Sequence, residues 1–242
     1  EQRPQGKGRT TALIRPFGAA ELSPTELTPS PISLRSRVHD YGGGVLCSGM
    51  DGETLLLVWI ADGALWRQDW RLPLMGDNRP EPLMDPLKLT RDGDWQLADG
   101  LLDLKRRRWL GIREINGVDQ LVSADMDATE QEPELRHQPA DFAGYGCLSA
   151  DGTQLAWVEW QQPAMPWQSS ELWCADLSPS GELCGARAIA GGEGVSVFQP
   201  QWLPDGSLLV AEDSDGWWNL KRRRPGSTTW ENPWPMTAES AM

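Results

Sequence analysis

Four polar turns recur along this chain at nearly equal distances, and this repeat limits the possible folds more than any other feature. Each turn is followed by an apolar run, and three of the four turns contain Asp-Gly, a strong hairpin signal. The turns begin at Asp51, Lys105, Asp151 and Asp205, which are spaced by 54, 46 and 54 residues. The chain therefore repeats one β-rich unit several times.

Each turn is also followed by a second strand-like segment at a similar offset, and these segments are ALWRQD (64–69), DQLVSAD (119–125), ELWCAD (171–176) and WNLKRR (218–223). A weaker strand precedes the next unit in three cases, namely PLKLT (86–90), ELRHQ (134–138) and ARAIAGG (186–192). The distance from the third turn, at Asp151, to its second segment is longer than the others, because QQPAMPWQSS is inserted between two strands.

Four short strands about every 50 residues, without a helix-period segment, are typical of β-propeller blades. The 25 glycines and 19 prolines also interrupt the chain too often for long helices. We therefore expect an all-β fold: a single, truncated β-propeller domain over 1–242, with about four full four-stranded antiparallel blades and part of another. The expected blades are 1–36 (partial), 37–90, 91–139, 140–192 and 193–242.

The composition argues against several classes of partner. A net charge of −13 disfavours nucleic acid, because binding phosphates needs clustered cations. The two basic runs, 105–108 and 221–224, are short and are predicted to be solvated charges at turns or strand ends. No apolar run approaches the length of a membrane span, so we expect no membrane partner.

Cysteine and histidine positions predict neither a metal site nor another cofactor. The four cysteines form no C-x-x-C pair, and His39 and His137 lie far apart in the sequence. Cys174 and Cys184 flank a turn, which leaves a disulfide across a hairpin as one alternative. The other alternative is buried reduced thiols in a cytosolic protein.

Several segments resemble one known family, in order and over nearly the whole chain. They are RVHDYGGGVL (37–46), LAWVEWQQPAMPW (155–167), SELWCADL (170–177) and SVFQPQWLPDGSLLVAEDSDGWWNL (196–220). They are similar to the N-terminal β-propeller of the prolyl oligopeptidase superfamily of serine peptidases, and most similar to its acylaminoacyl-peptidase and dipeptidyl-aminopeptidase-like branch.

The resemblance implies a seven-bladed propeller that precedes an α/β-hydrolase domain and caps its active site. The sequence ends at PMTAESAM, about where a fifth blade would end, so we expect the hydrolase domain to lie outside it. No Gly-x-Ser-x-Gly nucleophile elbow occurs, so no catalytic residue is predicted and the chain by itself is not expected to be an enzyme.

The implied partners are the hydrolase domain of the same polypeptide and short peptide substrates, in the cytoplasm. The propeller would restrict substrate access and shape the substrate cavity. Because the chain supplies only part of a ring, we also expect self-association through uncovered blade faces. The alternative function is a stand-alone propeller-like scaffold that binds other proteins.

Two groups of residues are candidates for function. Arg37, His39, Asp40 and Tyr41 precede Gly42–Gly44 at the start of a predicted innermost strand, where polar side chains could face the substrate cavity or form a buried cluster that fixes blade packing. The second group lies in the insertion, which the resemblance implies to be an interface with the hydrolase domain and which could otherwise be a stiff hairpin tip. Its members are Pro163, Met165, Pro166 and Trp167.

Overall fold

The computed structural model of the chain describes residues 1–18, 21–73 and 79–234. Helical structure in this part is limited to three 3-10 turns, namely η1 (Pro4–Gly6), η2 (Val38–Asp40) and η3 (Leu104–Arg106). No helix here is long and apolar enough to cross a membrane. The predicted all-β class is confirmed, while PMTAESAM (235–242) lies outside the described residues.

The chain divides into two compact units. Unit 1 comprises residues 1–109, 113–116 and 123–134, and unit 2 comprises 110–112, 117–122 and 135–242. The single domain over 1–242 and its blade boundaries stay predictions.

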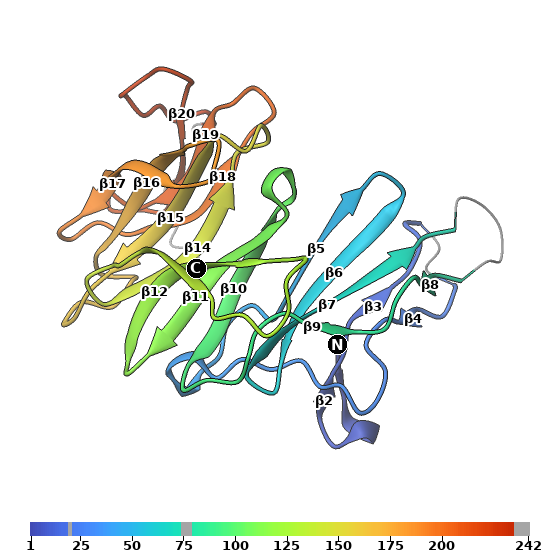
Figure 1. Cartoon of the computed structure of the whole chain (residues 1–242). Coiled ribbons are helices and arrows are strands. Elements are labelled where there is room, and N and C mark those ends of the chain that lie inside the picture. Colours follow the sequence, from blue (N-terminus) through green and yellow to red (C-terminus); the bar gives the residue numbers. More distant parts are fainter. Residues whose placement is uncertain (19–20, 74–78, 235–242) are drawn as a thin grey trace. The chain divides into compact units, whose positions relative to one another are not determined.

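The strands of unit 1 up to the division are β1 (Gln2–Arg3), β2 (Arg9–Thr10), β3 (Leu13–Ile14), β4 (Thr25–Glu26), β5 (Leu46–Asp51), β6 (Thr54–Ala61), β7 (Ala64–Arg71), β8 (Glu81–Pro82), β9 (Leu87–Lys88) and β10 (Gln96–Asp103). Strands with residues in both units are β11 (Arg108–Ile115), β12 (Val118–Asp125) and β13 (Glu134–His137). Unit 2 continues with β14 (Phe142–Leu148), β15 (Gln154–Trp160), β16 (Ser170–Leu177), β17 (Leu183–Gly192), β18 (Val197–Trp202), β19 (Leu208–Glu212) and β20 (Asn219–Arg223) (Figure 1).

Consecutive strands pair with each other, which gives the meander of a propeller blade in each large sheet. The orders are β5-β6-β7, β10-β11-β12-β13, β14-β15-β16-β17 and β18-β19-β20. The outer position of the first sheet is split, because β8 and β9 both pair with β7. The last sheet has three described strands, and a bridge between Arg222 and Glu231 adds one further pairing. The sheets are those of a partial propeller.

The predicted turns are confirmed where Asp-Gly was found. Asp51 pairs with Thr54 across the hairpin between β5 and β6. Gly52, Gly152 and Gly206 have φ values of 60°, 67° and 79°, which a side chain would oppose. The turn that contains Lys105 is formed differently, by η3.

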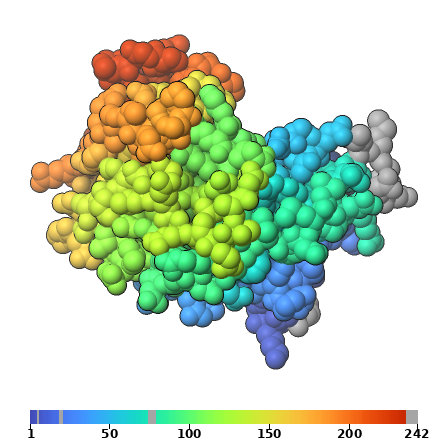
Figure 2. Space-filling model, viewed as in Figure 1, coloured from blue at the N-terminus to red at the C-terminus, as the bar shows by residue number. Residues whose placement is uncertain are grey.

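Each unit has its own apolar core. In unit 1, β6 is a nearly continuous apolar run that is buried along its length, as expected for a strand covered on both faces. In unit 2, the core cluster combines residues of β15, β16, β18 and β19, so sheets β14–β17 and β18–β20 pack together. The segment after β20 lies at the surface, drawn in red in Figure 2, where Trp230 Nε1 donates to the carbonyl of Ile189 (3.1 Å).

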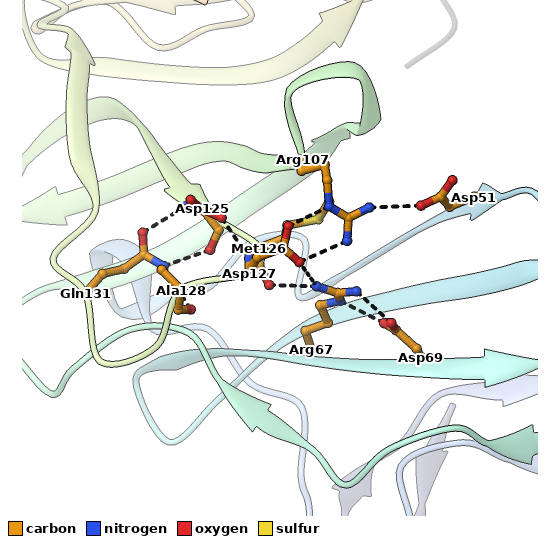
Figure 3. A network of polar contacts seen from close by, with 9 residues as sticks. All are labelled: Asp51, Arg67, Asp69, Arg107, Asp125, Met126, Asp127, Ala128 and Gln131. Carbon is orange, nitrogen blue, oxygen red and sulfur yellow. Dashed lines mark hydrogen bonds and ion pairs between the residues drawn. The ribbon is translucent and has the colours of Figure 1, made fainter.

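Two arginines of unit 1 converge on one aspartate (Figure 3). Arg67 on β7 donates to Asp127 Oδ1 (2.6 Å) and bonds Asp69 through two nitrogens (2.7 and 2.6 Å). Arg107 donates to both oxygens of Asp127 (2.5 and 2.9 Å) and also to Asp51 Oδ2 (2.9 Å). The network therefore ties β7, the β5–β6 turn and the residue after η3 to the segment that follows β12.

Asp127→Asn is expected to lower the free energy of unfolding by about 1–2 kcal/mol, because a buried and a half-buried guanidinium each lose one carboxylate, while solvent screens the half-exposed Asp127. Hydrogen bonds from Arg107, and then from Arg67, hold the pKa of Asp127 at about 2. This lies below the value of about 3.9 in an unfolded chain, so the contribution is complete above about pH 4 and is lost as the pH falls towards about 2. Urea denaturation at neutral and acidic pH measures both effects. If the free energies of unfolding of the variant and the unmodified chain differed by the same amount at both pH values, the stabilising role of the Asp127 carboxylate would be contradicted.

The prediction of solvated basic runs is wrong for four of their eight residues. Arg108 is buried and Arg106 is nearly so, because both pair with Asp103. Lys221 pairs with Asp215 (2.6 Å), and Arg222 pairs with Glu231 (2.5 Å). The partner carboxylates lie outside the two runs, at Asp103, Asp215 and Glu231, so the runs read in isolation gave no sign of them.

The cysteine alternatives are decided in favour of free thiols. Cys174 is buried, Cys184 is exposed, and the two face different residues across β16 and β17. Burial raises the pKa of the Cys147 and Cys174 thiols, and it raises that of Cys47 to about 12. These three thiols, of which Cys174 is buried and Cys47 and Cys147 are partly buried, are thus held protonated and unreactive.

Candidate functional site

A cavity of about 640 Å³ in unit 2 is the candidate functional site. It lies where β13, the end of β15 and the start of β16 meet the inserted segment 161–169. Its polar and aromatic lining includes His137, Glu159, Trp160, Glu171, Trp173 and Glu193. Side chains from separate parts of the sequence thus share one hollow.

The inserted segment interrupts the repeat between β15 and β16. In the two preceding sheets the corresponding strands are joined by two-residue turns, Asp62-Gly63 and Asn116-Gly117, in which every φ is positive. Such turns match the twist of a hairpin. Between β15 and β16 nine residues stand in place of two, and they include a cis peptide bond before Pro163.

Hydrogen bonds fold the insertion back on itself and tie it to the sheet. Gln168 and Ser169 both donate from their backbone N–H to the carbonyl of Met165 (2.8 and 3.1 Å). The backbone N–H of Gln162 donates to Asp141 Oδ2 (2.9 Å), and Ser169 Oγ donates to the carbonyl of Gly192 (2.8 Å). The cavity wall is therefore anchored at both ends.

A buried carboxylate lies at the centre of the polar lining. Glu159 Oε1 accepts a hydrogen bond from Trp157 Nε1 (2.6 Å) and contacts His137 Nε2 (2.7 Å). The His137 ring lies 5.1 Å from the ring of Trp157 and 5.5 Å from that of Trp173, measured between centroids. Trp173 Nε1 in turn donates to Glu171 Oε2 (3.1 Å). Both carboxylates are thus oriented by indole N–H groups.

The arrangement is suited to binding rather than to nucleophilic chemistry. A serine nucleophile needs its hydroxyl hydrogen-bonded to a base. The two lining serines use their hydroxyls elsewhere, since Ser169 bonds the carbonyl of Gly192 and Ser170 bonds that of Val197. His137 is engaged by Glu159 instead. The oriented carboxylates and indole rings remain as recognition groups.

The structure places the predicted residues of the insertion in two environments. Pro163 lines the cavity. Met165 and Trp167 are exposed by 46% and 50%, and Pro166 between them is partly buried. The exposed pair presents apolar surface, which suits an interface better than a solvated loop, but the interface role itself stays a prediction.

The other predicted group lies in unit 1 and is less compact than expected. The predicted start of an innermost strand at Arg37 is wrong, because β5 begins only at Leu46 and Val38–Asp40 form η2. Tyr41 is 98% exposed, and Arg37 lines a separate hollow with Trp95. A buried cluster of these side chains is therefore not observed, and their contact with substrate stays a prediction.

The glycines that follow explain the late start of β5. A Cβ on Gly43 would lie 2.7 Å from Ala98 Cβ, and one on Gly44 would lie 2.9 Å from Asp99 Oδ1. Gly44 and Asp99 exchange two hydrogen bonds (2.5 and 2.8 Å). This close backbone approach directs the segment to β10 before pairing with β6 begins.

Each of three innermost strands contains one strained residue that sequence reasoning missed. Asp99, Tyr145 and Gln199 have φ values of 54°, 57° and 52° and stand six residues before the turn positions 105, 151 and 205. The register shifts at this point in β14 and β18, as in a β-bulge, which re-aims a side chain. Tyr145 and Gln199 line a second hollow of unit 2, of about 470 Å³.

The cavity residues of β15 and β16 were also missed, although a signal was present. Glu159 interrupts the apolar run LAWVEW, and Glu171 opens the run ELWCADL. A carboxylate inside an apolar strand is buried only with partners, so such a residue marks a polar site. Because both segments also fit the repeat as core strands, the repeat alone did not identify their carboxylates as part of a polar site.

Comparisons with known proteins agree with this fold. No family model matches the chain, and no curated protein matches it. Puromycin hydrolase, a solved structure, is 28% identical with a TM-score of 0.79, over 96% of this chain and 36% of that one. A puromycin-hydrolyzing peptidase from Mycobacterium tuberculosis is 27% identical with a TM-score of 0.77, over 98% and 37%. The chain thus spans little more than a third of these proteins.

A more distant neighbour supports the fold alone. Prolyl oligopeptidase B from Galerina marginata is 12% identical with a TM-score of 0.54, over 81% of this chain and 28% of that one. The relationship predicted from the sequence motifs rests on the two nearer matches, the puromycin-hydrolysing proteins. The chain is a propeller segment similar to the N-terminal β-propeller of prolyl oligopeptidase-superfamily serine peptidases.

Proposed function

We propose that the chain is the non-catalytic propeller of a serine peptidase that acts on short peptides, and that it restricts access to an α/β-hydrolase domain of the same polypeptide. The observation that carries this proposal is the match over nearly the whole chain to about a third of two puromycin-hydrolysing proteins. The remaining two thirds of such a protein would hold the chemistry. The exposed Met165 and Trp167 are proposed contacts of the propeller with that domain.

Size exclusion is the physical basis of the proposed role. A rigid ring of blades admits an extended oligopeptide and rejects a folded protein. Arg37, His39, Asp40 and Tyr41 are the side chains we propose to face the admitted peptide. Cytoplasmic localisation is part of the proposal, and the free thiols support it, because disulfides are rare in reducing compartments.

The uncovered face of the last sheet also fits a longer polypeptide. The second hollow of unit 2 is lined by residues of all three strands β18–β20, including Leu209, Ala211 and Leu220. A neighbouring blade is the partner that this face would have in a longer propeller. Self-association through the same face would take the place of that blade in the isolated chain.

The test compares the 242-residue chain with the longer polypeptide encoded by its gene. The longer polypeptide is expected to hydrolyse puromycin and aminoacyl nitroanilides, to be blocked by a serine-directed fluorophosphonate, and to leave folded proteins uncut. The 242-residue chain is expected to hydrolyse none of them. Fluorophosphonate-sensitive turnover by the 242-residue chain would overturn the proposal, and so would a gene that ends at Met242.

A further inference from the structure

The cavity of unit 2 has a lining whose charge is strongly biased. Three lining residues, Glu159, Glu171 and Glu193, carry carboxylates, and no lysine or arginine is among the described residues that line it. The imidazole of His137, which also lines the cavity, contacts Glu159 at 2.7 Å. A positively charged group is therefore the occupant that this lining favours.

The aromatic part of the lining narrows the choice of cation. Trp160 and Trp173 line the same hollow as the carboxylates, and indole is the ring that attracts organic cations best. The described residues contain no group of three His, Cys, Asp or Glu side chains that could hold a metal ion. With about 640 Å³, the cavity has room for an alkyl chain as well as its charged end.

The orientation of the carboxylates is fixed before any ligand arrives. Indole N–H groups hold one oxygen of each, from Trp157 to Glu159 and from Trp173 to Glu171. The other oxygen of each carboxylate, Oε2 of Glu159 and Oε1 of Glu171, accepts no hydrogen bond from the described part of the chain. Each carboxylate can thus accept from an ammonium group without giving up its present bond.

The position in the repeat gives independent support. The same connection is a two-residue turn in both preceding sheets, whereas here nine residues build one wall of the cavity. Only this connection among the three has room to form a wall. The departure from the repeat and the charged, aromatic lining therefore coincide in one place.

We propose that this cavity is a binding site for an alkylammonium group, whose charge is held by Glu159 and Glu171 and whose methylenes pack on Trp160 and Trp173. The ammonium group could belong to a lysine side chain or to the amino terminus of a peptide. This inference goes beyond the proposed function, because it concerns binding by the chain itself and needs no hydrolase domain.

Calorimetric titration of the 242-residue chain with three peptides tests it. Acetyl-Gly-Lys-Gly-amide carries only a side-chain ammonium, Gly-norleucine-Gly-amide carries only a terminal one, and acetyl-Gly-norleucine-Gly-amide carries neither. At least one ammonium peptide is expected to bind about tenfold more tightly than the neutral peptide. Whichever of the two binds identifies the source of the group. Raising the salt concentration from about 0.1 M to about 1 M should weaken that binding.

Glu171→Gln is the variant of choice, since glutamine keeps an acceptor for Trp173 Nε1 but loses the charge. The substitution is expected to lower the affinity for the ammonium peptide about fivefold or more. Asp176→Asn is the matched control, because Asp176 is an exposed carboxylate on the same strand outside the cavity. It should leave binding unchanged.

Equal affinity for charged and neutral peptides would overturn the proposal, as would the absence of binding by either ammonium peptide up to about 10 mM. Equal effects of the two substitutions would overturn it as well. The comparisons between peptides and between salt concentrations use the unmodified chain. They therefore test the proposal even if Glu171→Gln perturbs the fold.

Discussion

Asp103→Ala is expected to lower the free energy of unfolding by about 3–5 kcal/mol, because it leaves two arginines without the carboxylate that they share. The Asp103 side chain is fully buried at the end of β10. Its Oδ2 accepts from Arg106 Nη1 and Arg108 Nε, both at 3.0 Å, and its Oδ1 caps η3 by accepting from the backbone N–H of Arg106 (3.3 Å). One substitution therefore removes a cap and two ion pairs.

Urea denaturation followed by tryptophan fluorescence measures this loss. Asp103→Asn keeps the volume and the capping oxygen but not the charge, so it should lie between alanine and the unmodified chain. Asp94→Ala removes an exposed aspartate close by in the sequence and should change stability by less than about 0.5 kcal/mol. A loss for Asp103→Ala as small as that of the control would show that the buried ion pairs contribute nothing.

Trp157→Ala is expected to destabilise the chain by about 3–5 kcal/mol, since it empties the volume of a fully buried indole on β15. It also removes the N–H group that Glu159 accepts from at 2.6 Å and the ring that lies beside Trp173, at 6.2 Å between centroids. Peptide binding in the cavity should be weakened together with stability, because Glu159 loses the group that orients it.

Two further substitutions separate volume from hydrogen bonding. Trp157→Phe keeps most of the apolar volume and should cost about 1–3 kcal/mol, chiefly through the lost N–H group. Trp167→Ala replaces a half-exposed tryptophan in the insertion and should change stability by less than about 0.5 kcal/mol. If Trp157→Ala were no more harmful than Trp167→Ala, the assignment of Trp157 to the core would be wrong.

The repeat of turns and apolar runs was enough to predict the long strands that flank the Asp-Gly turns, although not where β5 begins. Asp51-Gly52 and the runs around Leu57, Trp157 and Leu209 carry local signals, namely positive φ at glycine and apolar segments of strand length. Such signals depend on neighbours in the sequence, so they can be read without the tertiary structure. The same holds for the insertion after Trp160, which is visible as an interruption of the repeat.

The polar sites depended on contacts that sequence reasoning could not supply. Arg106 and Arg108 look like surface charges until Asp103 is found beneath them, and Glu159 looks like a strand residue until His137 and Trp157 are seen against it. Burial of a charge is decided by partners that the fold brings together, at separations of 22 residues for His137 and Glu159. The sequence by itself thus determined the strand order and the propeller relationship, because these follow from local pattern and repeat. Only the tertiary structure decided which charges are buried and where a cavity forms, because both depend on the packing of segments that are distant in sequence.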